Sequence, residues 1–322
     1  MPNKHNSISA LPTPRQLRYL VTLSETLNFR KAADALFVTQ SALSASLKQL
    51  ESLLGATLVE RDKRSVRFTP LGEQIVEHAR HLLASTEDLV RIARSAQHPM
   101  TGLLRLGVIP TIAPFLLPAI LPALRSRYPH LELYLREDVT DRLLDRLNAG
   151  ELDFALIALP FETDDLKVRE LFRDEFRVVV RDDSTLAKLK TVSLQDIDPD
   201  RVLLLEEGHC LRNHAIEACG TRRMAKRAVG LEATSLYTLL QMIEGGLGMT
   251  LLPEMILKGG ALSGSRLVTR PFSTRSPART IAIVMRRHGA RQKDFDLLCE
   301  LIIEQHRESA QVRTASRHRH SG

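Results

Sequence analysis

Two of the three cysteines of this 322-residue chain lie nine positions apart, at Cys210 and Cys219. A thiolate can attack a peroxide, and a second thiol can then convert the sulfenic acid into a disulfide. His209 and Arg212 flank the first cysteine and supply donors or cations that favour its thiolate. A helix that starts at this point, after a strand, would lower the pKa of the Cys210 thiol further. The segment therefore predicts a reactive Cys210, for which Cys219 is the natural resolving partner.

The spacing of the two cysteines has a geometric consequence if residues 209–219 are helical. Nine residues of helix rise by about 13 Å and turn the two thiols to opposite faces. A disulfide requires Cα atoms within about 7 Å of each other. A bond between these cysteines would force the helix to refold, which is the behaviour of a two-state switch.

Residue types alone leave other interpretations of this segment open. Two buried cysteines in an ordinary helix would be structural, and a cysteine hydrolase would need a histidine and a third partner from elsewhere. Zinc is a further possibility, although the spacing of the candidate ligands fits no compact zinc motif: His209, Cys210, His214 and Cys219. The third cysteine, Cys299, lies in the last predicted helix and is interpreted as structural.

The composition of the chain indicates its number of domains, the charge of its partners and its location. The hydrophobic fraction of 43% suffices for the cores of two or three domains. The net charge of +7 favours a polyanionic partner. The sequence contains no run of eighteen apolar residues, so no membrane span is predicted. The first residues contain no apolar signal core. The sequence therefore predicts a cytoplasmic protein without membrane contact.

Three helical patterns separated by short breaks occupy residues 14–54. Thr39 can cap the third helix and Gly55 can end it. Two short helices joined by a tight turn are the layout of a helix-turn-helix, whose second helix enters the major groove of DNA. A plain three-helix bundle is the alternative. Leucines would hold the third helix to the core, which leaves four side chains to contact bases and phosphates: Gln40, Ser41, Ser44 and Lys48.

A basic segment and a long helix follow. The alternating stretch 65–68 predicts a β-hairpin wing, and its neighbourhood is rich in cations that can bind the phosphate backbone. These are Arg61, Lys63, Arg64 and Arg67. A helix then runs over about 71–96, and its narrow apolar stripe favours an antiparallel partner helix and hence a dimer.

The pattern changes after residues 98–102 to strands that alternate with helices, which predicts an α/β domain with a mostly parallel sheet and two lobes. Ligands of such folds lie beyond the carboxyl ends of strands, where Thr111 and Thr140 are expected, although both can simply cap helices. A final helix is predicted at 290–307. The strands are expected at 103–109, 131–137, 152–159, 176–181, 201–207, 229–234 and 279–287.

The stretch AADALFVTQSALSASLKQLESLLGATLVERDKRSVRFTPLG resembles the DNA-binding region of LysR-type transcriptional regulators. The two-lobed domain is similar to their periplasmic-binding-protein-like effector domain, so the resemblance covers about 10–307. It implies three regions: an all-α winged helix-turn-helix DNA-binding domain (1–70), a linker and dimerisation helix (71–100) and an α/β two-lobed redox-sensing effector domain (101–307). The polar and basic composition of the remaining residues predicts a disordered basic tail (308–322).

Glu-x-Gly-His-Cys-Leu-Arg, with a second cysteine nine residues after the first, resembles the peroxide-sensing OxyR subfamily. Gly-Val-Ile-Pro-Thr at 107–111 and the Arg-Thr pair at 279–280 match it as well. The resemblance implies a peroxidatic Cys210 and a resolving Cys219. Asn213 stands where aspartate is usual, which removes a charge. The residues implied to orient hydrogen peroxide are Thr111, Thr140, His209 and Arg279.

The resemblance also implies a homo-oligomeric activator of oxidative-stress genes, up to a tetramer, and not an enzyme. Its partners would be double-stranded DNA, hydrogen peroxide and RNA polymerase, without a cofactor or metal. It would lie in the bacterial cytoplasm and associate with the nucleoid when bound to DNA. The main alternative is a LysR-type regulator that binds a small organic ligand between its lobes, with incidental cysteines. A cytosolic thiol peroxidase is a third hypothesis, against which the helix-turn-helix argues.

Overall fold

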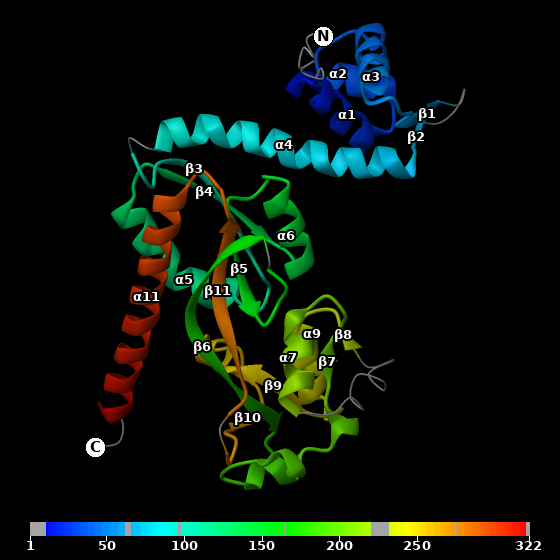
Figure 1. Ribbon diagram of the computed structural model, residues 1–322. Coiled ribbons are helices and arrows are strands. Elements are labelled where there is room, and N and C mark those ends of the chain that lie inside the picture. The colour runs from blue at the N-terminus through cyan, green and yellow to red at the C-terminus, as the bar shows by residue number, and fades with distance from the viewer. Residues whose placement is uncertain are drawn as a thin grey trace, which may run out of the picture. The chain divides into compact units, whose positions relative to one another are not determined.

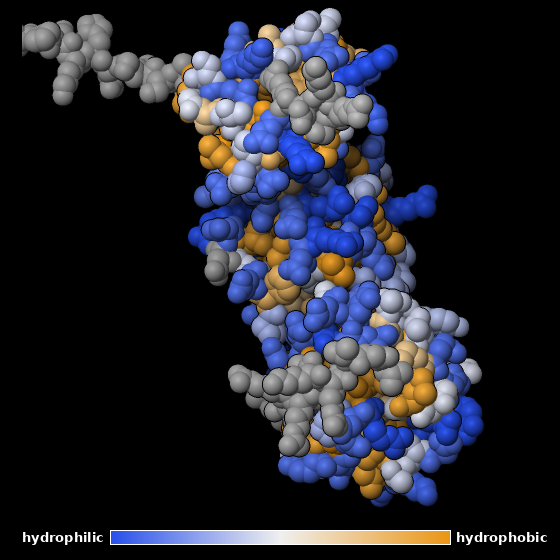
Figure 2. Space-filling model, turned by 90° about the vertical axis from the view of Figure 1, so that its right-hand side faces the viewer, coloured by the Kyte–Doolittle hydropathy of each residue, from blue (hydrophilic) through white to orange (hydrophobic). Residues whose placement is uncertain are grey.

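The computed structural model (Figure 1) describes most of the chain, as two compact units that meet in sequence at Arg94 and Ser95. Within the described residues, no helix combines the length and the apolar character needed to span a bilayer. The face shown in Figure 2 is largely hydrophilic, with apolar residues scattered between polar ones. The described segments are 11–61, 66–95, 98–163, 165–219, 232–274 and 276–319.

Short helices pack around one apolar core in residues 11–61 of the first unit. The Thr39 hydroxyl accepts a hydrogen bond from the Ala42 amide and caps the third helix, and Gly55 ends it with a φ of 66°. Both signals were predicted from the sequence, because caps depend on neighbouring residues alone. The helices are α1 (Pro14–Thr26), α2 (Phe29–Ala35) and α3 (Gln40–Leu54).

The predicted wing is present as an antiparallel hairpin, in which Val59 of β1 pairs with Phe68 of β2. A long helix follows it directly. A Cβ atom added at Gly72, in the first turn of that helix, would overlap the carbonyl oxygen of Leu58, so glycine allows the helix to begin this close to the wing. The elements are β1 (Val59–Arg61), β2 (Val66–Phe68) and α4 (Pro70–Ser95).

A seven-stranded mixed sheet runs through the described part of the second unit (Figure 1), in the order β10-β6-β11-β5-β3-β4, with β9 also paired to β6. Strand β3 is parallel to β4 and β5. The strands are β3 (Gly102–Val108), β4 (Leu131–Glu137), β5 (Phe154–Leu159), β6 (Leu166–Arg181), β9 (Thr250–Pro253), β10 (Leu267–Arg270) and β11 (Ala278–Arg286).

Two lobes share this sheet. The first part of β6 pairs with β11, whereas its last part pairs with β9 and β10. Each lobe has its own apolar core, one around Phe154 and Ile281 and the other around Val179 and Leu251. The last predicted strand is present as β11 and pairs with β5 of the first lobe. The expectation of a mostly parallel sheet is wrong at this point, because β11 comes back from the other lobe and therefore runs antiparallel to β5.

Helices cover the two lobes, and a parallel pair of two-residue strands supports the second lobe. Helix α11 lies beside α5 in the first lobe (Figure 1). The helices are α5 (Ala113–Arg127), α6 (Thr140–Asn148), α7 (Cys210–Cys219), α9 (Leu236–Glu244), α10 (Glu254–Lys258) and α11 (Gln292–Arg319), and the short strands are β7 (Leu204–Leu205) and β8 (Glu232–Ala233).

Two predicted boundaries need correction. The strands expected at 201–207 and 229–234 shorten to β7 and β8, and 229–231 lie outside the described residues. The last helix runs to Arg319, so 308–319 do not form the expected disordered tail. Low hydrophobicity indicated that this tail cannot form a core. It does not prevent a helix, and 308–319 contain neither glycine nor proline.

Candidate functional site

Most of the predicted DNA-contacting side chains that the structure describes are exposed. Gln40, Ser41 and Lys48 of α3 are exposed and Ser44 is half-buried. Arg67 of β2 is also exposed, as a phosphate-binding wing requires. Lys63 and Arg64 lie outside the described residues, as does the side chain of Arg61.

A narrow cavity at the lobe boundary brings together site residues from three elements. Thr111 follows β3, Thr140 begins α6, and His209 and Cys210 stand at the start of α7. The Thr140 hydroxyl is buried without a hydrogen-bond partner among the described residues, and it lies close enough to Cys210 to lower the pKa of that thiol. The remaining walls are formed by Ile109, Pro110, Val139 and Gly208.

Arg279 is fixed behind this cavity with 1% of its surface exposed. Its Nη1 donates to the Thr111 hydroxyl at 2.8 Å and its Nη2 to the Thr111 carbonyl at 3.1 Å. Its Nε donates to Asp174 Oδ2 at 3.1 Å, and Asp174 also accepts the Met255 amide at 3.0 Å. The guanidinium therefore ties β11, β6 and the segment after β3 together.

Asp174 is a site residue that sequence reasoning missed. It faces Arg279 because the two residues are direct partners in the β11–β6 register. Register between strands about a hundred positions apart has no local sequence signal. A carboxylate next to the guanidinium also balances its charge, so the field of Arg279 at the thiol is weaker than that of an isolated cation.

The pKa of Cys210 contradicts the sequence-based expectation. Burial raises the pKa of this thiol, while the charge of Arg279 and the Thr140 hydroxyl act in the opposite direction. The thiol is only 7% exposed, so loss of hydration outweighs the start of the helix. In this conformation Cys210 is therefore protonated at neutral pH.

Arg212 does not favour the Cys210 thiolate, although the sequence predicted that it would. It lies about 200° around the helix from Cys210, which turns it toward the second lobe. Its Nη1 donates to the Leu205 carbonyl at 3.4 Å and pairs with the Glu232 carboxylate. Asn213, which stands where aspartate is usual, is exposed on α7 and does not line the cavity.

The burial of His214 close to Arg279 was not predicted from the sequence. This residue lies one helical turn after Cys210, and a spacing of four residues could have indicated that both share a face. It is 5% exposed, and its Nδ1 has no partner within the described residues. Burial, followed by the charge of Arg279, lowers the pKa of His214 to about 4, while the Pro160 carbonyl acts in the opposite direction. The imidazole is therefore neutral at neutral pH.

The other two cysteines lie apart from this cavity. The backbone of Cys219 ends α7, and its side chain is outside the described residues. Cys299 is fully buried in the core of the first lobe, where burial raises its pKa to about 12. In the parts of the chain that the structure describes, no three histidine, cysteine or acidic residues gather in a metal-binding arrangement.

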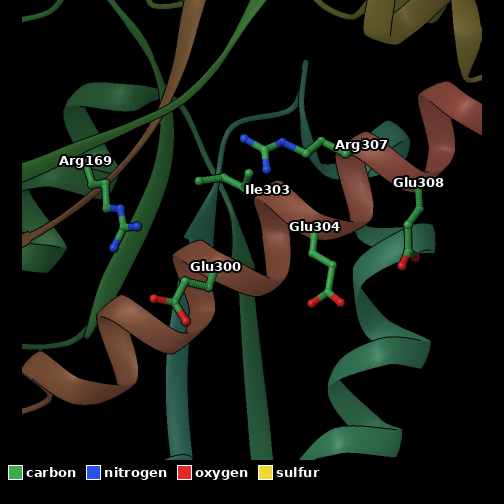
Figure 3. Close-up of a pocket in the computed structure, with 6 residues that line it drawn as sticks. All are labelled: Arg169, Glu300, Ile303, Glu304, Arg307 and Glu308. Carbon is green, nitrogen blue, oxygen red and sulfur yellow. The ribbon is translucent and has the colours of Figure 1, made fainter.

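A charged groove on the first lobe offers no comparable site. Figure 3 shows Arg169 of β6 beside a row of glutamates and Arg307 on α11. Glu304 is already paired with Arg127 at 2.8 Å, and Arg169 lies 3.5 Å from Asp296. Ile303 is the one apolar wall residue among those of the groove, so it lacks the apolar enclosure typical of small-molecule sites.

The two units together define a class of protein. A winged helix-turn-helix joined to a two-lobed α/β effector domain is the architecture of a DNA-binding transcription regulator. The family model described as "Bacterial regulatory helix-turn-helix protein, lysR family" matches residues 14–73, and the one described as "LysR substrate binding domain" matches 97–307. The chain belongs to the LysR-type transcriptional regulators, which are not a class of enzymes.

Curated relatives and solved structures narrow this assignment. The regulator EstR of Acinetobacter baylyi is 44% identical over 297 residues, which cover 92% of this chain and 97% of that protein. The dual regulator OxyR of Escherichia coli is 36% identical over 288 residues, or 89% and 94% of the two chains.

Among solved structures, a full-length OxyR variant from Pseudomonas aeruginosa superimposes with a TM-score of 0.72 at 32% identity and covers 91% of this chain and 95% of that one. A variant of Corynebacterium glutamicum OxyR in its H2O2-bound form gives 0.64 at 32% identity, with 96% and 97% covered. Within the LysR family, the chain is therefore similar to the OxyR group of hydrogen peroxide-inducible activators.

Proposed function

We propose that this protein senses hydrogen peroxide through a reversible disulfide between Cys210 and Cys219 and passes the change to promoter DNA. One observation carries the proposal: the two cysteines are the first and last residues of a single helix, α7. That helix separates their Cα atoms by about 13 Å, whereas a disulfide needs about 7 Å or less. The disulfide and this helix therefore exclude each other.

The chemistry begins at the buried cavity. The Cys210 sulfur attacks one peroxide oxygen, an S–O bond forms as the O–O bond breaks, and the second oxygen leaves as water after it takes a proton. In this proposal, Thr111, Thr140 and His209, which line the cavity, orient the peroxide through their hydroxyls and imidazole. Arg279 favours both the thiolate and the developing negative charge. The Cys219 thiol then attacks the sulfenic sulfur and releases a second water.

The position of α7 explains how this local event reaches the rest of the domain. Cys210 packs into the core of the first lobe, while Leu211 and Ala215 pack into the core of the second. Refolding of the helix therefore removes packing from both lobes at once. A change of this kind alters the surfaces by which copies of the effector domain meet.

A dimer is supported by α4. Ala79 and Leu83 of this helix pack against Leu17 of α1. A second row of three leucines is exposed, and their spacing of eleven and seven residues aligns them within about 20° on one face. These are Leu71, Leu82 and Leu89. An antiparallel partner helix would cover them, and we infer that a dimer or tetramer engages RNA polymerase at promoters in the cytoplasm.

The disulfide can be tested by peptide mapping of the full-length protein. Treatment with about one equivalent of hydrogen peroxide, followed by blocking of free thiols, should yield a linked peptide pair that contains Cys210 and Cys219. The Cys210→Ser variant should yield none. Recovery of free thiols only, or of a link from Cys210 to Cys299, would contradict the proposal.

Binding to DNA can be tested at the wing. Arg67→Ala removes an exposed cation that contacts phosphate, so affinity should fall alike for operator and unrelated DNA, and the salt dependence should weaken by about one counterion. Gln40→Ala, at the start of α3, should instead reduce affinity mainly for the operator. A loss with Arg67→Ala that is confined to one sequence would argue against the phosphate role.

The alternative, a regulator of organic ligands with incidental cysteines, also has support. An apolar cavity of about 460 Å³ lies between the lobes, which is within the usual size of ligand sites. On this hypothesis the Cys210→Ser variant would still respond to its inducer in transcription assays. On the proposed function the same variant responds to no oxidant.

A further inference from the structure

The apolar cavity adjoins the one at Cys210. Its walls come from both lobes: Pro114 and Phe115 of α5 on one side, and Leu236, Tyr237 and Leu240 of α9 on the other. Most of the lining residues are apolar or aromatic, and fewer are polar. The other lining residues are Pro110, Thr111, Glu137, Leu205, His209, Thr234, Ser235 and Ala261.

Three residues line both cavities. Pro110, Thr111 and His209 belong to both linings, so the space beside Cys210 and the apolar cavity adjoin at these residues. A molecule with a small polar end and a larger apolar end would place each end in a matching environment. Hydrogen peroxide has only the polar end and leaves the larger cavity unused.

We propose that the preferred oxidant of this protein is an uncharged organic hydroperoxide, whose alkyl or aryl group occupies the apolar cavity while its –OOH group reaches Cys210. This inference rests on the proposed redox function and specifies its substrate. The rings of Phe115 and Tyr237 favour an aromatic or branched group. The exposed Glu137 carboxylate in the wall disfavours an anionic one, so fatty acid hydroperoxides are poor candidates.

The reaction balances without a further reagent. The Cys210 sulfur bonds to the terminal oxygen of R–OOH, the O–O bond breaks, and the oxygen attached to R leaves as the alcohol R–OH after it takes the proton that the Cys210 thiol gives up. Sulfur is oxidised by two electrons and the hydroperoxide is reduced by two. Cys219 then displaces water from the sulfenic acid and forms the disulfide. His209 lines both cavities, so its imidazole lies beside the departing alcohol oxygen.

The experiment compares rates of Cys210 oxidation in the full-length protein with hydrogen peroxide, tert-butyl hydroperoxide and cumene hydroperoxide. Cumene hydroperoxide should react about tenfold faster than the tert-butyl compound, because it carries the larger apolar group into the cavity. Ala261→Phe fills the cavity and should slow the cumene reaction by about tenfold, while the rate with hydrogen peroxide changes by less than about twofold. The hydrogen peroxide rate thus reports whether the fold and the thiol are intact.

A second variant guards against misfolding. Tyr237 is exposed, so Tyr237→Ala should fold normally and slow only the organic hydroperoxides. Tyr134→Ala removes another exposed tyrosine, on β4 and outside both cavities, and should change none of the rates.

Two outcomes separate this inference from the function on which it rests. The inference is overturned and the peroxide switch stands in any of three cases: hydrogen peroxide oxidises Cys210 faster than cumene hydroperoxide does, the organic compounds react no faster with increasing size, or Ala261→Phe and Tyr237→Ala slow all three oxidants equally. If none of the three oxidises Cys210, the proposed redox function fails as well.

Discussion

Cys210 and Cys299 are both buried in helices of the effector domain, yet their surroundings differ. Burial raises the pKa of each thiol. At Cys210 the charge of Arg279 and the Thr140 hydroxyl oppose this effect, and the thiol borders a cavity. Cys299 lies inside an apolar core, and its pKa rises to about 12. Burial alone therefore does not distinguish the two thiols, whereas the polar groups beside Cys210 and the cavity that it borders do.

The largest expected effect comes from exchanging each thiol for a hydroxyl. Cys210→Ser should abolish peroxide-dependent disulfide formation and the transcriptional response, because a serine hydroxyl cannot form the sulfenic acid. Cys299→Ser should leave both unchanged, at a modest cost in thermal stability from a hydroxyl placed in the core. Thiol counting and promoter assays measure the two variants side by side. A Cys299→Ser protein that loses its response would reverse the assigned roles.

The next effect concerns the polar group that distinguishes the Cys210 site. Thr140→Val keeps the shape of the side chain but removes the hydroxyl, so the thiolate loses a hydrogen bond and oxidation should slow by about tenfold to hundredfold. The rate can be followed by stopped-flow measurement of thiol loss. Thr250→Val is the matched control, because its buried hydroxyl donates to the Leu203 carbonyl at 2.8 Å, away from the cavity. Equal slowing in both variants would point to general loosening of the domain.

The free energy of unfolding should depend on pH more through the helix that contains Cys210 than through the helix that contains Cys299. His214 has a pKa of about 4 in the folded protein, against an ordinary value of 6.5. Above pH 6.5 the imidazole is neutral in both states, and below it the unfolded or opened state takes up the proton first. The free energy of unfolding should therefore fall as pH drops from 6.5 toward 4, by about 2 kcal/mol at pH 5.

Urea unfolding at pH 7.5 and 5 measures this loss, and His214→Gln should remove most of it. The groups that act on His214 are Arg279 of β11 and the Pro160 carbonyl. His306→Gln on α11 is the control. Burial also lowers the pKa of His306, but its ring is only partly buried and is stacked on Phe172, so its contribution should be smaller. A pH dependence that survives in the His214→Gln protein would assign the effect to other groups.

Features with local signals were predictable from the sequence. Thr39 and Gly55 mark the ends of α3 through neighbouring atoms, and the strand at 131–137 follows from its own alternation. The helix from Cys210 to Cys219 was likewise predicted. The redox site required more than local information. Asp174 meets Arg279 through strand register, and Arg212 finds Glu232 twenty positions later.

The pKa of Cys210 shows most directly what could not be predicted from the sequence alone. The start of a helix and nearby basic residues are visible in the sequence, and both predict a lower thiol pKa. The degree of burial depends on packing between two lobes and outweighs them. His214 shows the converse, since its spacing from Cys210 was visible but its burial was not.

The pair between Arg212 and Glu232 has a consequence for how the proposed switch resets. Arg212 lies on α7 between the two cysteines, so refolding of this helix must pull its guanidinium away from Glu232 and from the Leu205 carbonyl. Both acceptors belong to β7 and β8, which the disulfide does not include. They remain in place to recapture the guanidinium once a reductant cleaves the bond. Recovery after a pulse of oxidant then needs only a reductant, because the disulfide form keeps the two acceptors to which Arg212 binds when the helix forms again.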